Sequence, residues 1–354
     1  MSTVRDIAAS AGVSPATVSR ALNNSGVVRP EVRQRIMREA DQLGYRRSRR
    51  RPVERENRVR SIGMLCLDES TMGPFHGYDS VIWGAVARAA HALKFQVVAV
   101  DPQMRRQDET YSAFAQRTGV DGFVVRVDAL SRRACSEIAA DGVPHVVVSD
   151  RFDDPSVNFI QCDSRDASAR AIQHLLDLGH RRIGLCHNPV SDTDHNDRIA
   201  AYEGVLRNAG IEPADDLRIA APPSLEGGAA ALSRFLAMAD PPTAIFAADP
   251  MLAVGVIRRA SEIGLDVPSE LSVVGADDGD LRRFTVPAFS AVCQDANELG
   301  HQAGNWLCRA LTDPAMRGES VRRSVEAIFE VSQSTAPPPA SPVRITPTGQ
   351  RLPN

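Results

Sequence analysis

AGVSPATVSRALNNSG, residues 11–26, carries the clearest structural pattern in this sequence. Ser14 is a favourable N-cap residue, and Pro15 suits the first helical position, where its missing N–H leaves no hydrogen bond unmade. Apolar residues recur at helical spacing on both sides of Gly12, at Ala8, Ala11, Val13, Val18 and Leu22. The pattern predicts two short helices joined by a tight turn, which is a helix-turn-helix. A third helix is predicted over about residues 30–43.

The helix that begins at Pro15 has the surface of a DNA-reading helix. Its outward side chains are small or polar, of a size that fits the major groove. Arg20 suits a bidentate contact with guanine, worth about 1–3 kcal/mol of discrimination, and its alternative role is a surface charge. Thr17, Ser19 and Asn23 suit phosphate contacts, which position a helix without reading sequence. We therefore expect DNA contacts from Thr3, Ser14, Pro15, Ala16, Thr17, Ser19, Arg20 and Asn23.

The charge of the chain is unevenly distributed. The net charge is −3, but the first 60 residues contain 14 arginines and six acidic residues, a local net charge of +8 that leaves −11 for the remainder. A basic N-terminal segment on an acidic body is typical of a protein that meets phosphate at one end. Within this segment, RRSRRRPVERENRVR (residues 46–60) has almost nothing to bury and is predicted to be a linker.

Composition and cysteine use are those of a globular protein. Hydrophobic residues make up 43% of the chain and charged residues 24%. No apolar run reaches the roughly 18 residues of a membrane helix, and the N-terminus lacks a signal-peptide segment. We therefore expect a cytoplasmic protein without membrane contact. The six cysteines are scattered without metal-ligand spacing, so we expect reduced core thiols, no metal and no cofactor.

From residue 61 the pattern changes to short apolar runs that alternate with amphipathic helices. SIGMLCL, FQVVAVD, DGFVVRV and HVVVSD form a first series, and RIGLCH, TAIFAAD and LSVVGADD belong to a second that starts near Asp163. Such runs predict the buried strands of parallel, doubly wound sheets. Two series predict two similar α/β subdomains, with a cleft at the carboxyl ends of the strands. The proline-rich tail, residues 336–354, is expected to be disordered.

TVRDIAASAGVSPATVSRALNNSG (residues 3–26), LGY, PHVVVSDR, LGHRRIGL and PSELSVVGADD together resemble the lactose-repressor (LacI/GalR) family of bacterial transcription regulators. The resemblance covers about residues 2–335. It implies an all-α headpiece that binds pseudo-palindromic operator DNA as a homodimer. It also implies a core like that of periplasmic sugar-binding proteins, where a small molecule, a sugar or related polyhydroxy metabolite, controls operator affinity.

The resemblance also implies domain boundaries. The headpiece would comprise residues 1–45, the linker 46–60 and the core 61–335. Within the core, the first subdomain would comprise about residues 61–161 and 291–322, and the second about 162–290 and 323–335.

Four polar residues match the family's ligand contacts: Asp150, Arg198, Asp249 and Asp277. Carboxylates beside an arginine suit hydrogen bonding to vicinal hydroxyls. For Asp150 and Asp277 the alternative is a capping or turn role. Asp249 stands where the family usually has asparagine. An aspartate carboxylate only accepts hydrogen bonds, whereas an asparagine amide both donates and accepts them. Phe75 resembles the aromatic residue that caps the cleft in relatives, and Phe246 is an alternative stacking residue that otherwise belongs to the core.

The linker departs from the family pattern. In relatives this segment folds into a short helix on DNA and wedges a leucine into the minor groove. Here the wedge position is Glu54, and Pro52 falls inside the expected helix. The linker instead offers arginines, which enter a narrow minor groove without unstacking bases. We expect Arg49, Arg50 and Arg51 to contact DNA with little or no leucine-type kink.

Motifs for an enzyme on a doubly wound fold are absent. No GxGxxG follows the first strand, and the sequence has no Walker loop and no GxSxG elbow. The remaining alternative is a small-molecule-binding protein whose headpiece no longer regulates transcription. The basic headpiece and the intact helix from Ser14 to Arg20 favour a ligand-responsive regulator, most simply a repressor.

Overall fold

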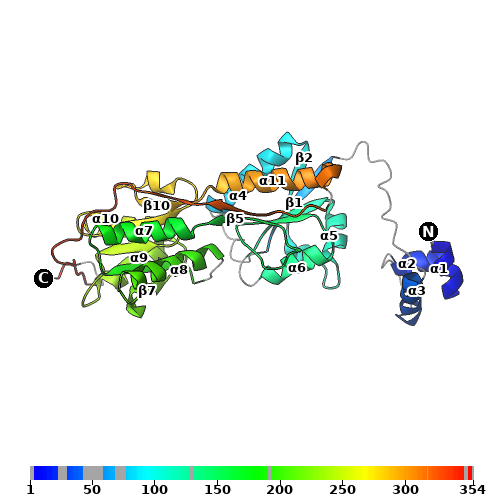
Figure 1. The fold of residues 1–354 in the computed structure, drawn as a ribbon, viewed down its shortest axis with the longest axis horizontal. Helices are drawn as coiled ribbons and strands as arrows, with labels where there is room; N and C mark the ends of the chain where they lie inside the picture. The colour runs from blue at the N-terminus through cyan, green and yellow to red at the C-terminus, as the bar shows by residue number, and fades with distance from the viewer. Residues whose placement is uncertain are drawn as a thin grey trace. The chain divides into compact units, whose positions relative to one another are not determined.

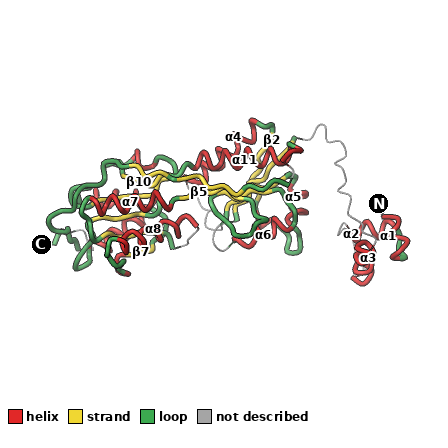
Figure 2. Tube along the Cα trace, in the orientation of Figure 1, coloured by secondary structure: helices red, strands yellow, loops and turns green. Residues whose placement is uncertain are grey.

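The computed structural model describes residues 4–22, 30–42, 59–67, 77–127, 131–189, 193–316, 318–346 and 350–352. Its contacts divide the chain into two compact units, Met1–Arg58 and Val59–Asn354. The first unit is helical, and the second contains two sheets with helices around them (Figure 1, Figure 2). The predicted fold class is confirmed.

The N-terminal unit is built from α1 (Val4–Ala11), α2 (Pro15–Leu22) and α3 (Pro30–Gln42). Gly12, at φ +62°, makes the turn between the first two helices in a conformation that favours glycine. Ser14 Oγ accepts a hydrogen bond from the Thr17 backbone N–H at 3.1 Å, which confirms the predicted N-cap. The three helices enclose a small apolar core of Ile7, Ala8, Ala11, Val18, Ala21, Ile36 and Ala40.

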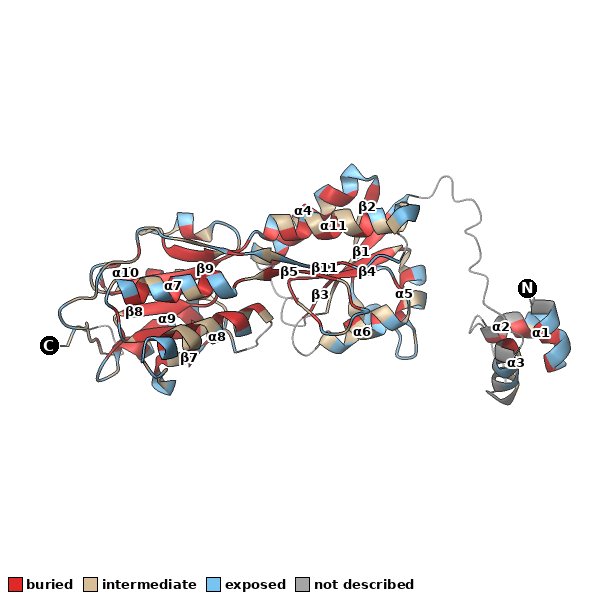
Figure 3. Ribbon diagram, in the orientation of Figure 1, coloured by how far each residue is buried: buried red, intermediate tan, exposed pale blue. Residues whose placement is uncertain are grey.

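The first sheet of the second unit is fully parallel. Its strand order is β11 (Arg322–Glu326), β5 (Phe159–Asp163), β4 (His145–Val148), β3 (Gly122–Arg126), β1 (Arg60–Cys66) and β2 (Phe95–Val100). The helices of this subdomain are α4 (Gly77–Ala92), α5 (Tyr111–Thr118), α6 (Arg132–Ala140) and α11 (Ala296–Thr312). Its strands β3 and β4 are buried along their whole length, as a sheet covered on both faces requires (Figure 3).

The second sheet repeats this arrangement. Its strand order is β12 (Ile328–Glu330), β10 (Ser290–Cys293), β9 (Ser272–Asp277), β8 (Ala244–Ala247), β6 (Ile183–His187) and β7 (Arg218–Ala220), and only β12 runs antiparallel to its neighbour. Its helices are α7 (Arg165–Asp177), α8 (Thr193–Asn208), α9 (Leu225–Leu236) and α10 (Pro250–Glu262).

The chain crosses between the two sheets three times, from β5 into α7, from β10 into α11, and from β11 into β12. Each crossing comes a few residues after the boundaries expected at 161, 290 and 322. The reason is that the strands stay paired beyond those points: Asp163 with Glu326 in the first sheet, and Cys293 with Asp277 in the second.

Two helices approach closely where glycine replaces a side chain. A Cβ on Gly300 of α11 would lie 2.4 Å from the Ile82 carbonyl oxygen of α4. Glycine is therefore required for this close packing of α11 on α4.

The C-terminal tail is ordered where the structure describes it, which corrects the expectation of disorder. The Ala336 backbone N–H donates to Ser272 Oγ at 3.0 Å, Ile345 is 2% exposed in the core of the second subdomain, and Arg351 forms hydrogen bonds to both Glu270 carboxylate oxygens at 2.7 Å. Several prolines restrict the unbound chain, so these contacts lose less entropy on docking. The proline-rich, polar composition of the tail did not indicate that Ile345 would be buried.

All six cysteines are described, and none of them forms a disulfide there, which agrees with the expected reduced thiols. Burial raises the pKa of Cys135, Cys186 and Cys308 to about 12, which keeps these thiols protonated and unreactive. No helix among the described residues combines the length and apolar character needed to cross a membrane.

Candidate functional site

The candidate DNA-reading surface is the start of α2. Pro15 and Ala16 are exposed and Val18 is buried against α1 and α3, as predicted for these three residues, and Thr17 is half-buried. The backbones of Ser19 and Arg20 belong to α2, but their side chains lie outside what the structure describes. Thr3, Asn23, the linker arginines 49–51, Pro52 and Glu54 also fall outside the described residues, so their expected roles stay predictions.

In the core, the first subdomain contributes an arginine–carboxylate pair at the carboxyl end of its sheet. Arg126, the last residue of β3, donates from Nε to Asp79 Oδ1 at 2.8 Å and from Nη1 to the Val148 carbonyl oxygen at 3.1 Å. Its guanidinium lies 5.3 Å from the centroid of the Tyr78 ring. Both charged residues are buried, and they fix the N-terminal turn of α4 against the sheet.

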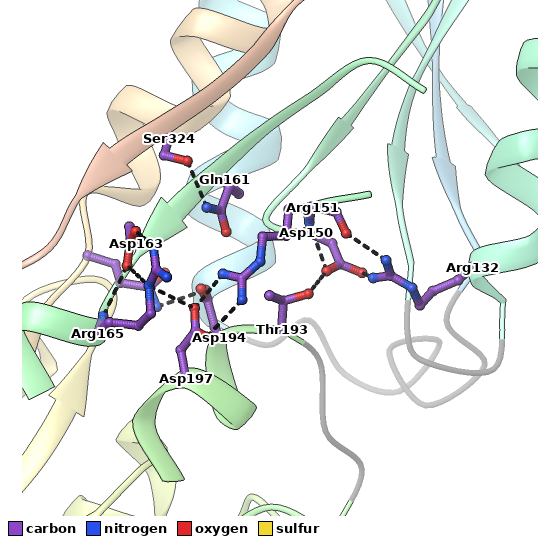
Figure 4. A network of polar contacts seen from close by, with 11 residues as sticks. Arg132, Asp150, Arg151, Gln161, Asp163, Arg165, Thr193, Asp194, Asp197 and Ser324 are labelled. Atoms are coloured by element: carbon purple, nitrogen blue, oxygen red, sulfur yellow. Dashed lines mark hydrogen bonds and ion pairs between the residues drawn. The ribbon is translucent and has the colours of Figure 1, made fainter. Parts of the chain in front are cut away.

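Asp150 follows β4 and connects the two subdomains. Ser149, at φ +71°, turns the chain there in a left-handed conformation that costs a non-glycine residue about 1–2 kcal/mol. The Asp150 carboxylate accepts hydrogen bonds from Arg132, from the Arg151 backbone N–H at 2.9 Å and from the Thr193 hydroxyl. Since Thr193 begins α8 of the second subdomain, these contacts join the two subdomains (Figure 4).

The second subdomain brings Arg198 close to the chain around Asp249, and the expected ligand contacts of both residues stay predictions. Arg198 is 2% exposed; its Nη1 donates to the Ala248 carbonyl oxygen at 2.7 Å, and its Nη2 lies 3.9 Å from Asp278 Oδ1. Asp249 caps α10, where its Oδ1 accepts from two backbone N–H groups, and its Oδ2 lies 3.9 Å from His195 Nε2.

Asp277 has the turn role that the sequence analysis gave as the alternative, and its expected ligand contact stays a prediction. Its side chain has no exposed surface, and its Oδ2 accepts from Arg282 Nη1 at 2.8 Å. Its Oδ1 accepts from the Leu281 backbone N–H at 2.9 Å. Arg282 draws this carboxylate into a buried ion pair, and the next residue, Asp278, lies beside Arg198 in its place.

Phe246 has the core role that the sequence analysis gave as its alternative to stacking. It is fully buried in β8 within the core shared by the two sheets, so it has no face for stacking on a ligand. Phe75 lies outside the described residues, and its capping role stays a prediction.

Two further connections between the subdomains were not predicted. The Tyr78 hydroxyl lies 2.5 Å from Ser149 Oγ and donates to Gln294 Oε1 at 3.1 Å, and Gln294 Nε2 donates to Asp194 Oδ2 of α8 at 3.0 Å. Arg151 and Asp197 form a second connection by a bidentate ion pair (Figure 4).

Burial dominates the electrostatics of this cluster. Desolvation raises the pKa of Asp278 to about 6, against the opposing effect of nearby Arg198, and the neighbouring carboxylates of Asp249 and Asp277 raise it further. Desolvation also raises the pKa of Tyr78 well above its usual value, so its hydroxyl stays protonated. Perturbed groups gathered in a cleft mark a functional site.

The sequence positions of several residues that the sequence analysis missed could have indicated that they belong to the candidate site. Arg126, Asp278 and Gln294 each end or follow a strand, at the edge where parallel sheets bind ligands. Asp194 and Asp197 sit in the first turns of α8, one helical turn or less before Arg198.

Comparison with known proteins agrees with this geometry. Residues 3–48 match the family described as bacterial regulatory proteins, lacI family, and residues 172–330 match a periplasmic binding protein-like domain. The HTH-type transcriptional regulator MalR of Streptomyces coelicolor is 33% identical over 351 residues, covering 94% of this chain and 96% of MalR.

Solved structures of similar architecture include two with bound ligands. The lac repressor dimer bound to operator and the anti-inducer ONPF gives a TM-score of 0.65 at 25% identity, covering 95% of this chain and 99% of that chain. The transcriptional regulator CelR in its cellobiose complex gives the same TM-score and identity, covering 94% of this chain and 100% of that chain. The helix-turn-helix, the paired sheets and these similarities together place the chain in the lacI family of bacterial regulatory proteins.

Proposed function

We propose that this protein is a cytoplasmic transcriptional regulator, acting as a repressor on operator DNA, whose affinity for DNA is controlled by a small molecule in the cleft between the core subdomains. The observation that carries the proposal is the presence, in one chain, of a capped second helix in a helix-turn-helix and of two core subdomains that meet through charged side chains. Neither feature alone would imply regulation. Together, the helix would bind DNA and the core would bind the small molecule that controls this binding.

The mechanism follows from the three crossing segments. A ligand that bridges the walls shifts the two subdomains relative to one another, and it shifts the equilibrium only by its difference in affinity between the two arrangements. In a dimer, that movement changes the spacing of the two headpieces and so the fit to a pseudo-palindromic operator. We place Asp150, Arg198, Asp249 and Asp278 among the ligand-contacting groups.

A homodimer is part of the proposal. Phe284, Val286, Ile328 and Val331 are 53–89% exposed on the segments that flank β10, where they give the second subdomain an apolar surface. Exposed large apolar groups gathered in this way mark association sites. No catalytic role is proposed, since the relatives with assigned roles are regulators.

A gel-shift assay tests the proposal. The full chain should retard DNA from the region upstream of its own gene and not a scrambled sequence of equal length. Arg20→Ala should weaken specific binding by about 1–3 kcal/mol, the value of one guanine contact. Equal retardation of both DNAs would leave the headpiece without the proposed role.

A further inference from the structure

Four side chains at the boundary between the core subdomains form a continuous series of hydrogen bonds. Ser149 Oγ lies 2.5 Å from the Tyr78 hydroxyl, which lies 3.1 Å from Gln294 Oε1, and Gln294 Nε2 lies 3.0 Å from Asp194 Oδ2. Ser149 and Tyr78 belong to the first subdomain, and Asp194 lies in α8 of the second. Ser149, Gln294 and Asp194 are at most 6% exposed. The series therefore crosses the boundary inside the protein, where water competes little for its hydrogen bonds.

The direction of these hydrogen bonds is fixed from the Asp194 end. A carboxylate only accepts hydrogen bonds, so Asp194 faces the Nε2 donor of Gln294. This orients the amide and leaves Oε1 toward Tyr78, which donates its single proton to it. Burial raises the pKa of Tyr78 well above its usual value, which keeps that proton in place. Ser149 then donates to the Tyr78 oxygen, so every donor points toward Asp194 and each bond strengthens the next.

Gln294 stands where the chain leaves the second sheet. Its backbone N–H donates to the Asp277 carbonyl oxygen at 3.0 Å, which ties it to the end of β9. The next residue, Asp295, caps α11, the helix that packs on α4 of the first subdomain. The Gln294 backbone and Asp194 are therefore both held on the side of the second subdomain. The hydrogen bond from Tyr78 to Gln294 is the member of the series that a separation of the subdomains must break.

Tyr78 is oriented by its own subdomain. The Arg126 guanidinium lies 5.3 Å from the centroid of its ring, a favourable position for a cation. Arg126 also donates to Asp79, the residue that follows Tyr78 in the first turn of α4. The hydroxyl that reaches across the boundary is thus attached to a ring and a helix end that the first subdomain holds in place.

We propose that Tyr78 and Gln294 form a latch that favours the closed arrangement of the core subdomains, and that Asp194 is the positioning residue that orients the Gln294 amide for it. The latch belongs to the core alone, whereas its effect on DNA binding rests on the proposed function. Loss of one net hydrogen bond between the subdomains should change the ratio of closed to open molecules about fivefold.

Two substitutions that exchange donor and acceptor test the latch. Gln294→Glu keeps an acceptor for Tyr78 but sets a carboxylate against Asp194, so it should open the core. Adding Asp194→Asn places an amide donor opposite the new carboxylate. The double variant has the net charge of the wild type and should close the core again.

Gln302→Glu is the matched control. Gln302 Nε2 also donates to a carboxylate, that of Glu298, at 2.7 Å, and its Oε1 accepts from Arg323 at 2.8 Å. All three residues belong to α11 and β11 of the first subdomain. The same substitution there disturbs a similar contact without touching the boundary between the subdomains.

Hydrogen exchange of the full chain, measured by mass spectrometry of its peptides, reports on both subdomains. In Gln294→Glu the backbone N–H groups in the first turns of α4 and of α8 should exchange about fivefold faster than in the wild type, because exchange follows the open population. The double variant and the Gln302→Glu control should exchange at the wild-type rate. Faster exchange in α8 alone, or a double variant that exchanges as fast as Gln294→Glu, would overturn the latch.

Tyr78→Phe tests the other half of the latch. It keeps the ring beside Arg126 and removes the hydroxyl, while the contact between Gln294 and Asp194 stays intact. Exchange in the first turns of α4 and α8 should rise as it does in Gln294→Glu. Wild-type exchange in Tyr78→Phe would contradict the proposal.

Gel shifts with DNA from upstream of the gene separate the latch from the proposed function. A change in operator affinity in Gln294→Glu that the double variant reverses would support both. An open core with unchanged operator affinity would keep the latch and count against the proposed coupling of the core to DNA binding.

Discussion

Arg151 and Asp197 join the two core subdomains by a bidentate ion pair, with Nη1–Oδ2 at 2.5 Å and Nη2–Oδ1 at 2.9 Å. Arg151 follows β4 in the first subdomain, and Asp197 lies on α8 in the second. The pair therefore holds the walls together with groups of the chain itself. A ligand that binds the closed arrangement more tightly would therefore have to supply less of the free energy of closing the subdomains.

Breaking this pair should open the core. The Arg151 side chain is 37% exposed, so solvent screening limits the pair to about 1 kcal/mol or less. That is still enough to change the ratio of closed to open molecules severalfold. We expect Asp197→Ala to increase the radius of gyration measured by small-angle X-ray scattering, and the exchange Arg151→Asp with Asp197→Arg to restore it. Glu137→Gln, which breaks an exposed pair within α6, is the control. Identical scattering from Asp197→Ala and Glu137→Gln would show that the pair does not hold the cleft.

Arg198 should be required for the ligand response and not for DNA binding. The residue is buried beside Asp278 and far in sequence from the headpiece. We expect Arg198→Ala to abolish the ligand-induced shift in melting temperature while operator affinity in a gel shift stays within about threefold of wild type, a difference of less than 1 kcal/mol. A variant that keeps the full ligand response would refute the role given to Arg198.

The charge of Asp278 should lower the free energy of unfolding, by an amount that depends on pH. Its pKa is raised from 3.8 to about 6 on folding, so the folded chain holds the proton more tightly than the unfolded chain between these values. The free energy of unfolding contributed by this group therefore falls as pH rises through that window, and the penalty is complete above it. Two pH units correspond to about 3 kcal/mol at most.

Asp278→Asn should remove the destabilisation caused by the charged carboxylate at this position. Urea denaturation should show the variant more stable than wild type at pH 8 and the difference shrinking toward pH 4. Comparison of the two proteins cancels the contributions of other titrating groups. A stability difference that does not vary with pH would mean that the charge of Asp278 is not the cause.

Docking of the C-terminal tail should contribute to stability. Ile345 packs in the core of the second subdomain, and its backbone N–H donates to the Leu236 carbonyl oxygen at 3.1 Å. Ile345→Ala should lower the free energy of unfolding by about 2 kcal/mol, the low end for a buried isoleucine. Met104→Ala, at a residue 59% exposed, should change it little. If both variants unfold at the same urea concentration, the tail adds no stability.

More of the fold than of the candidate site could be predicted from the sequence. Helical spacing around Gly12 and the cap at Ser14 are local signals, and both predicted the headpiece correctly. The alternating apolar runs likewise predicted two parallel sheets. The partner of a side chain, by contrast, depends on residues far apart in sequence. Asp278, for example, lies beside Arg198, which is 80 residues away in the sequence, and no local pattern indicated this contact. The contact between Arg151 and Asp197 likewise depends on the packing of two subdomains.

The central claim is that a ligand in the cleft changes the affinity of the headpiece for operator DNA. The most direct measurement is fluorescence anisotropy of labelled upstream DNA titrated with the full chain, with and without a saturating concentration of the sugar that gives the largest thermal shift. The account predicts specific binding that is about 1,000-fold or more tighter than to scrambled DNA, and a change of roughly 5- to 150-fold on adding the compound. An operator affinity that stays the same with the cleft saturated would contradict it.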